Sequence, residues 1–376
     1  MKIYEEVFFT LLRAGLWKTP VEIPEGFDQW GRVARMAKEQ SVLAMVGNVM
    51  LENPQIVEKL DMDFRARLKS FIMNSMLTHT MLNNTLLTVV SELRKHEVEG
   101  VLLKGQGIAR NYPVPDLRQC GDIDFYVGVD NYIKTCEVLG NLASWKEDTA
   151  PMDTVKHYDI RIGKTTVEIH RYTDVNASSK YNAIYQKYSD DGMTRNLRVL
   201  DFAGTPVNTP SDDFNAFYVF NHMWHHFITS GVGLRQMCDW MLLLHNRRGT
   251  IDMDHLKAIL TDMDLMKPWQ AFGCVLVKDM GMPQEEFPFY DEKMACKRRR
   301  ILAHVLSEGN FGQERAKAKN RRGEGYFYGK IKSMFLHIVR SSQLMLLFPS
   351  HSFRQMLSTL KAGFNAVWKD KICKNR

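Results

Sequence analysis

The spacing of apolar residues changes twice along this chain, near residue 96 and near residue 209, and these changes restrict its fold more than any other feature. In the first 95 residues apolar side chains recur every three or four positions, as in Val42, Met45, Val46 and Val49. This period matches one face of an α-helix. The chain is therefore expected to begin with four or five helices.

The second segment has the shorter periods of β-strands. Val101-Leu102-Leu103 is a short apolar run, and Ile123 and Phe125 alternate with Asp122 and Asp124. Apolar runs and alternations of this length predict strands. Residues 130–143 return to helical spacing, and the runs 155–161 and 165–170 predict a hairpin that turns at Gly163-Lys164.

The rest of the chain completes an α+β pattern. A last short strand is expected over 198–200 with Val207, and Ser211 followed by Asp212 and Asp213 then makes a good helix start. The predicted class is α+β, with a small mixed β-sheet core between two helical regions. The expected boundaries are an N-terminal helical region over 1–95, an α/β core over 96–208 and a C-terminal helical region over 209–376.

Composition narrows the class of protein. With 376 residues, 45% hydrophobic and 25% charged, the chain can bury a core and is not disordered. The net charge of +7 suits a phosphate-bearing partner without singling out nucleic acid. None of the six cysteines forms a zinc-ligand spacing, no basic and apolar leader begins the sequence, and no run reaches the ~20 apolar residues of a membrane span. The expected compartment is the cytoplasm.

Three acids are candidates for one catalytic site. Asp122 and Asp124 project from the same face of their strand, where like charges repel unless a cation such as Mg²⁺ lies between them. Glu168 lies on a later strand, with His170 on the same face. In a two-metal mechanism a third carboxylate can deprotonate the attacking hydroxyl, and we assign Glu168 that role.

Taken alone, Gly121-Asp122-Ile123-Asp124 also fits a solvated turn that runs into an edge strand. The upstream segment Lys104-Gly105-Gln106 favours function, because a strand ends there in residues that leave the backbone open to a phosphate. Lys104 and Arg118 are placed to neutralise phosphates, although Arg118 has Asp116 and Asp122 as alternative partners.

Residues 100–170 resemble the nucleotidyltransferase-fold superfamily, in which a strand ends in glycine, an Asp-x-Asp strand follows and a later strand supplies one acid. A narrower resemblance, to bacterial nucleotidyltransferases of uncharacterised function often found near polysaccharide genes, is carried by Leu103-Lys104-Gly105, Tyr112-Pro113, Arg118 and Gly121-Asp122-Ile123-Asp124.

The resemblance implies an enzyme with two Mg²⁺ ions that moves NMP from an NTP to a hydroxyl or phosphate acceptor, with pyrophosphate leaving. Gly105 and Gln106 would hold the triphosphate, Asp122 and Asp124 the metals, and Glu168 the third catalytic and metal position. The superfamily commonly has Gly-Ser where this chain has Gly105-Gln106, so the preferred nucleotide stays open. A sugar or small metabolite is the favoured acceptor.

Other functions remain alternatives. They are a non-catalytic nucleotide-binding or regulatory module, and a toxin-like nucleotidyltransferase that acts on tRNA or protein. The pair Gly105 and Gly107 with Asp124 also suits a dinucleotide site, but the third glycine is missing and Pro113 and Pro115 interrupt the crossover helix that such a site needs.

Two further groups of residues have simpler explanations. His222, His225 and His226 crowd one expected helix, but the glutamate of a His-Glu-x-x-His zinc motif is absent, which favours histidines that pack the helix. Residues 328–368 are basic and amphipathic, which allows weak contact with an anionic membrane, although a helix packed on the protein is favoured.

Overall fold

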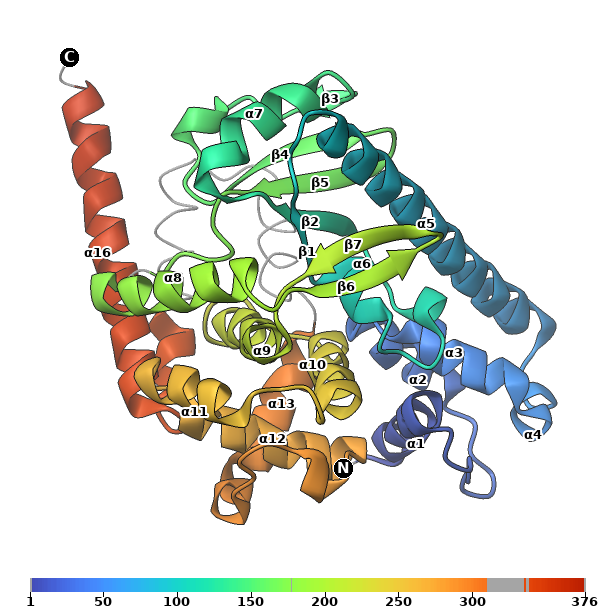
Figure 1. Cartoon of the computed structure of the whole chain (residues 1–376). Coiled ribbons are helices and arrows are strands. Elements are labelled where there is room, and N and C mark those ends of the chain that lie inside the picture. Colours follow the sequence, from blue (N-terminus) through green and yellow to red (C-terminus); the bar gives the residue numbers. More distant parts are fainter. Residues whose placement is uncertain (1, 177, 310–334, 336–337, 375–376) are drawn as a thin grey trace.

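The computed structural model describes residues 2–176, 178–309, 335 and 338–374, with side chains up to residue 361. Across these residues a mixed sheet runs in the order β3-β4-β5-β2-β1-β7-β6 between helices (Figure 1). Pairs β2/β5 and β1/β7 are parallel and the other pairs antiparallel. The strands are β1 (Val101–Leu103), β2 (Asp122–Tyr126), β3 (Trp145–Lys146), β4 (His157–Ile162), β5 (Thr165–His170), β6 (Arg198–Phe202) and β7 (Thr205–Thr209). The predicted α+β class with a mixed sheet is confirmed.

The N-terminal region is helical, as predicted. Its helices are α1 (Ile3–Trp17), α2 (Trp30–Glu39), α3 (Leu43–Glu52), α4 (Pro54–Val57) and α5 (Met62–Lys95). Asp61 caps α5, since its Oδ1 accepts from the backbone N–H of Phe64. The length of α5 lets this one helix reach from the other N-terminal helices to the sheet (Figure 1).

One face of the sheet is apolar. Side chains of β2 and β5 that alternate with the acids are buried there under α5 and α7 (Gly128–Gly140): Ile123, Phe125, Val167 and Ile169. From α5 they meet Leu82, Leu86 and Val89. Burying a side chain of this size contributes about 1.5–3 kcal/mol, so this face supplies stability to the core.

The C-terminal region is a helical layer that shares a core with the N-terminus. Its helices are α9 (Asp212–Thr229), α10 (Leu234–Arg247), α11 (Met253–Asp262), α12 (Met266–Met280), α13 (Arg298–Glu308) and α16 (Pro349–Lys374). Trp17 donates to the carbonyl oxygen of Met280 at 2.8 Å, and the Gln40 amide donates to that of Val305 at 3.2 Å. Helices far apart in sequence are therefore packed together; the three-region division stays a prediction.

Several short elements complete the fold. They are α6 (Gly105–Ala109), α8 (Ser179–Thr194) and the 3-10 turns η1 (Pro115–Leu117), η2 (Pro151–Asp153), η3 (Gln284–Glu286) and η4 (Glu292–Lys297). The segment after β1, where the sequence predicts a backbone open to a phosphate, forms the short helix α6. Because β1 and β2 are antiparallel, they cannot form the parallel βαβ unit of a dinucleotide site, and that alternative is excluded.

The basic amphipathic stretch predicted over residues 328–368 lies partly outside the described residues. In the described part, Phe353 and Leu357 of α16 are exposed, and Arg354 forms an ion pair with Asp264 at 2.6 Å. No helix among the described residues has the length and hydropathy needed to cross a membrane.

Candidate active site

Strands β4, β5 and β2 place acids and histidines in register on the second face of the sheet. Asp124 on β2 lies opposite Glu168 on β5, and Glu168 lies opposite Asp159 on β4. The neighbouring row pairs His170 with His157. Residues opposite one another on paired strands point to the same side of a sheet, so these five side chains share one face.

Asp124 is the buried carboxylate of the site. Its Oδ1 lies 2.8 Å from Lys104 Nζ and 3.2 Å from His170 Nε2. Burial acts to raise the pKa of Asp124, but the Lys104 ammonium and the hydrogen bond with His170 outweigh burial and hold the pKa well below its ordinary value. Asp124 is therefore ionised.

Asp122, two residues earlier on the same face of β2, is the exposed carboxylate. Loss of hydration, then the nearby carboxylates of Asp124 and Glu168, raise the pKa of Asp122 to about 6, against the opposing effect of Lys104. The clustered acids thus resist ionising together. A divalent cation relieves this repulsion.

A tight turn brings Lys104 onto this face. Lys104 has φ of 43° and Gly105 has φ of 40°, in the region that favours glycine. A Cβ at position 105 would lie 3.5 Å from the carbonyl oxygen of Asp122, so the turn backbone lies close to the start of β2. Burial acts to lower the pKa of Lys104, but Asp124 and Glu168 outweigh burial and raise it. Lys104 is therefore a fixed cation.

His170 bridges two carboxylates. Its Nε2 lies 3.2 Å from both Asp124 Oδ1 and Glu168 Oε2, and its Nδ1 lies 3.2 Å from the carbonyl oxygen of Tyr172. Carbonyl and carboxylate oxygens only accept hydrogen bonds, so all three contacts are satisfied when both ring nitrogens carry a proton. Burial acts to lower the pKa of His170, but the hydrogen bonds with Asp124 and Glu168 outweigh it and raise the pKa.

These side chains line a cavity of about 430 Å³ between the sheet and the helices α9 and α10. The predicted site residues that line it are Lys104, Gly105, Arg118, Asp122, Asp124 and Glu168. Gln106 does not: it is fully buried on α6, and its amide has no hydrogen-bond partner among the described residues. Its role in phosphate binding stays a prediction.

Arg118 is bound by a partner that sequence reasoning missed. Its Nε and Nη2 donate to the two carboxylate oxygens of Asp239 at 2.7 and 2.8 Å, and Tyr112 donates to Asp239 at 2.7 Å. All three side chains are buried. The ion pair therefore connects the loop before β2 to α10. The partner of Arg118 is Asp239, not Asp116 or Asp122 as the sequence allowed.

The three histidines of α9, predicted to pack the helix, line the same cavity. Burial lowers the pKa of His222 well below its ordinary value, and burial with the charge of His225 lowers the pKa of His226 to about 4. The ring centroids of His222 and His226 are 4.6 Å apart, and the ring planes meet at 74°. At neutral pH these two histidines are uncharged, so they form a polar wall without adding positive charge.

Other lining residues were not singled out from the sequence: Lys156, His157 and Asp174. His157 and Asp159 lie two positions apart on β4, as Asp122 and Asp124 do on β2. Their side chains therefore also project from one face of their strand, which the sequence alone could have shown. Arg235 comes from α10, more than 100 positions away, and donates to the carbonyl oxygen of Gln119 at 2.7 Å.

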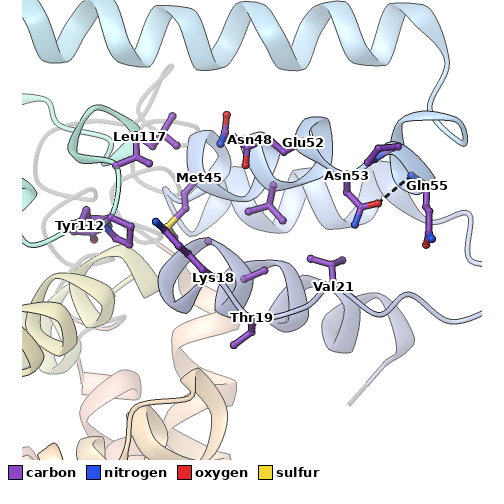
Figure 2. Close-up of a pocket in the computed structure, with 16 residues that line it drawn as sticks. Lys18, Thr19, Val21, Met45, Asn48, Glu52, Asn53, Gln55, Tyr112 and Leu117 are labelled. Carbon is purple, nitrogen blue, oxygen red and sulfur yellow. Dashed lines mark hydrogen bonds between the residues drawn. The ribbon is translucent and has the colours of Figure 1, made fainter.

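The described residues also line hollows outside this cavity. One of about 340 Å³ shares Asp174 and His225 with it and continues between α8, α9 and α16. A larger one of about 820 Å³ lies in the N-terminal region, where Figure 2 shows Met45 and Tyr112 at one end and Asn53 and Gln55 at the other. None of the three acids lines this larger hollow.

The three acids carry the kind of ligand atom that hard divalent cations prefer. Asp122, Asp124 and Glu168 supply carboxylate oxygens to one cavity, and Mg²⁺ prefers one or two carboxylates together with water and substrate phosphates. The raised pKa of Asp122 marks the charge that such a cation would neutralise. Lys104, Lys156 and Arg235 add positive charge to the same cavity, which suits an anionic substrate.

Comparisons with known proteins show the family of the chain. A family described as uncharacterised nucleotidyltransferases matches residues 28–278, more than half of the chain. The crystal structure of an antigenic nucleotidyltransferase-like protein from Paracoccidioides brasiliensis is similar at 13% identity over 54% of this chain and 92% of that chain, with a TM-score of 0.32. No curated protein matches the sequence.

Proposed function

Since the chain belongs to the family of uncharacterised nucleotidyltransferases, we propose that it moves NMP from an NTP to a hydroxyl or phosphate acceptor with release of pyrophosphate. The observation that carries the proposal is the register of β2 and β5, which sets Asp124 opposite Glu168 with Asp122 on the same face. Like charges brought together at a cavity suit a metal-dependent transfer of an anionic group.

The proposed roles follow from these contacts. Asp122 and Asp124 hold Mg²⁺, which when bound neutralises the phosphates and the charge that develops on them. Lys104 Nζ lies 2.8 Å from Asp124 Oδ1, and Lys104 would be free to pair with a phosphate if Asp124 held the ion instead. Gly105 and Gln106 remain the proposed neighbours of the triphosphate, and Arg118 secures the loop beside it.

The reaction is a single displacement. The acceptor oxygen forms a bond to the α-phosphorus, the bond from that phosphorus to the oxygen bridging to the β-phosphate breaks, and pyrophosphate leaves. Glu168 accepts the proton of an acceptor hydroxyl. Its Oε2 contacts His170 at 3.2 Å, which orients the carboxylate.

The acceptor is proposed to enter from the adjoining hollow that shares Asp174 and His225 with the site. Its volume of about 340 Å³ lies within the range of small-molecule sites, roughly 300–1,000 Å³. Tyr181, Trp224 and Gln355 offer aromatic surface and an amide there. These features favour a sugar or small metabolite over a tRNA or protein.

Incubation with each α-labelled NTP, Mg²⁺ and a cell extract tests the proposal. We expect label to reach an acceptor with the wild-type chain and not with the Asp122→Ala/Asp124→Ala variant. Label transferred by both chains, or by neither, contradicts the proposed transfer. NTP binding without transfer would instead favour the non-catalytic nucleotide-binding module.

A further inference from the structure

His157, Glu168 and His170 form a cluster with nitrogen as well as oxygen donors. One ligand atom from each residue lies within 4.8 Å of those of the other two. Among the described residues, no other group of three or more histidine, cysteine or acidic side chains meets this distance. Glu168 Oε2 is 3.2 Å from His170 Nε2 and 3.9 Å from His157 Nδ1. The cluster is thus distinct in chemistry from the carboxylates of Asp122 and Asp124.

The orientation of His170 is that of a metal ligand. Without a metal both ring nitrogens carry a proton, and a metal ion would replace the proton on Nε2. The hydrogen on Nδ1 would stay, because Nδ1 lies 3.2 Å from the carbonyl oxygen of Tyr172, which only accepts. The lone pair of Nε2 then faces Glu168 and Asp124. Histidines that ligate metals usually donate their other ring N–H to a carbonyl or carboxylate in this way, which fixes the tautomer.

His157 supplies an independent sign of a missing ligand. Its Nδ1, the atom that faces Glu168, is buried and has no hydrogen-bond partner among the described residues. Leaving such an atom without a partner is unfavourable. The other ring nitrogen lies 3.5 Å from Asp159 Oδ1, so a carboxylate stands behind the ring. An ion at Nδ1 would satisfy the orphaned atom.

We propose that His157, Glu168 and His170 bind a first-row transition-metal ion, with Zn²⁺ as the four-coordinate case. Zn–N and Zn–O bonds of about 2.0–2.1 Å put neighbouring tetrahedral ligands about 3.3 Å apart, close to the 3.2 Å between Glu168 Oε2 and His170 Nε2. Imidazole suits Zn²⁺ and its neighbours, whereas Mg²⁺ requires oxygen. Water or Asp124, 3.2 Å from His170 Nε2, completes the set.

The inference rests on the proposed function in one respect, because Glu168 belongs to both sites. Its Oε2 faces the two histidines, and its Oε1 remains for the proton of the acceptor. The site would then hold two kinds of ion, a hard one at Asp122 and Asp124 and a borderline one at the histidines. Removal of Mg²⁺ would not remove the second ion.

Metal titration of the chelator-treated full chain, without nucleotide, tests the inference. Zn²⁺ is followed by calorimetry, and Co²⁺ by the visible absorption that imidazole ligands give it. We expect His157→Gln to weaken Zn²⁺ binding by about 100-fold or more, because the loss of a residue that only supports a ligand already costs about 10- to 100-fold, and to reduce the Co²⁺ absorption. His225→Gln is the matched control, since His225 lines the same cavity outside the cluster, and it should bind Zn²⁺ as the wild type does.

Asp122→Asn separates this inference from the proposed function. It should keep Zn²⁺ binding and lose Mg²⁺-dependent transfer. Equal Zn²⁺ affinity in wild type and His157→Gln, or equal losses in His157→Gln and His225→Gln, overturns the metal site, whatever the transfer assay gives. Zn²⁺ binding that depends on His157, in a chain that transfers no label, supports the metal site and overturns only the proposed reaction.

Discussion

The two faces of β2 and β5 are built from alternate residues of the same two strands, and they have opposite roles. On one face Ile123, Phe125 and Ile169 are buried against α5 and α7. On the other, Asp124 and Glu168 face each other in register. The first face holds the fold together, and the second assembles like charges that burial disfavours. The difference shows that one alternating pattern can specify both a core and a site.

Lys104 and His170 explain how the second face is tolerated. Lys104 contacts Asp124 at 2.8 Å, and His170 contacts both Asp124 and Glu168 at 3.2 Å. Asp122, which lacks such a direct cation, has its pKa raised to about 6 by loss of hydration and the neighbouring acids. On the polar face, the negative charges of the buried acids are therefore balanced by Lys104 and His170. The charge of Asp122 at the exposed end has no such partner, and a metal is proposed to bind there.

The largest expected effect is on catalysis at that exposed end. Asp122→Asn should lower transfer about 10³-fold, because the variant loses a charge that holds the metal. Stability should not fall: the raised folded pKa of Asp122 means that its contribution to stability is lost as pH rises through about 6. Turnover assays and thermal unfolding at pH 7 check both statements. Lower stability with normal turnover would show that the face of Asp122 supports the fold and not catalysis, contrary to the proposal.

The opposite face should give the opposite result. Phe125→Ala should reduce the free energy of unfolding by about 3–5 kcal/mol, since it removes a buried ring and leaves a cavity. Turnover per folded molecule should change little. Denaturant unfolding and active-site titration measure the two quantities, and Phe125→Leu serves as the milder control. If turnover falls by more than the fraction of folded protein, the apolar face also takes part in catalysis, which contradicts the proposed separation of the two faces.

Asp124 should couple the two properties. Asp124→Asn removes the buried charge that faces Lys104 and His170, so we expect a loss of about 3–5 kcal/mol in stability together with lost transfer. Asp122→Asn is the matched comparison on the same strand. Should both variants unfold at the same denaturant concentration, the compensating role of Lys104 and His170 would be wrong.

The smallest expected effect is a pH dependence of metal binding. Below about pH 6 protons occupy Asp122 and compete with the cation, so Mn²⁺ affinity should fall by up to about tenfold per pH unit. Above that pH the affinity should level off. Calorimetry at pH 5, 6 and 7 measures the slope, and Asp122→Asn should flatten it. A slope that persists in this variant would assign the proton to another group.

The acids and the fold class could be predicted because they follow local periods. The alternation around Ile123 and Phe125 shows both the strand and the face of its acids, and a change to helical spacing marks α7 and α9. His157 and Asp159 carry the same signal on β4, which the sequence interpretation did not use.

Other features depend on contacts that no local pattern encodes. Helix α8 was missed because tyrosines such as Tyr185 and Tyr188 form its buried face, where an apolar period was sought. Asp239 meets Arg118 across 121 positions, and the histidines of α9 line the cavity only because α9 lies beneath the acidic face. These contacts arise from the packing of the helical regions on the sheet.

The most direct test of the central claim follows the two ends of the triphosphate. Wild-type chain with Mg²⁺ and acceptor-containing extract is supplied in parallel with α-labelled and γ-labelled NTP. If the acidic face performs nucleotidyl transfer, the α-label reaches the acceptor and the γ-label appears as pyrophosphate, and Asp122→Asn loses both. Transfer of the γ-label to the acceptor, or no dependence on Asp122, would contradict the proposed transfer.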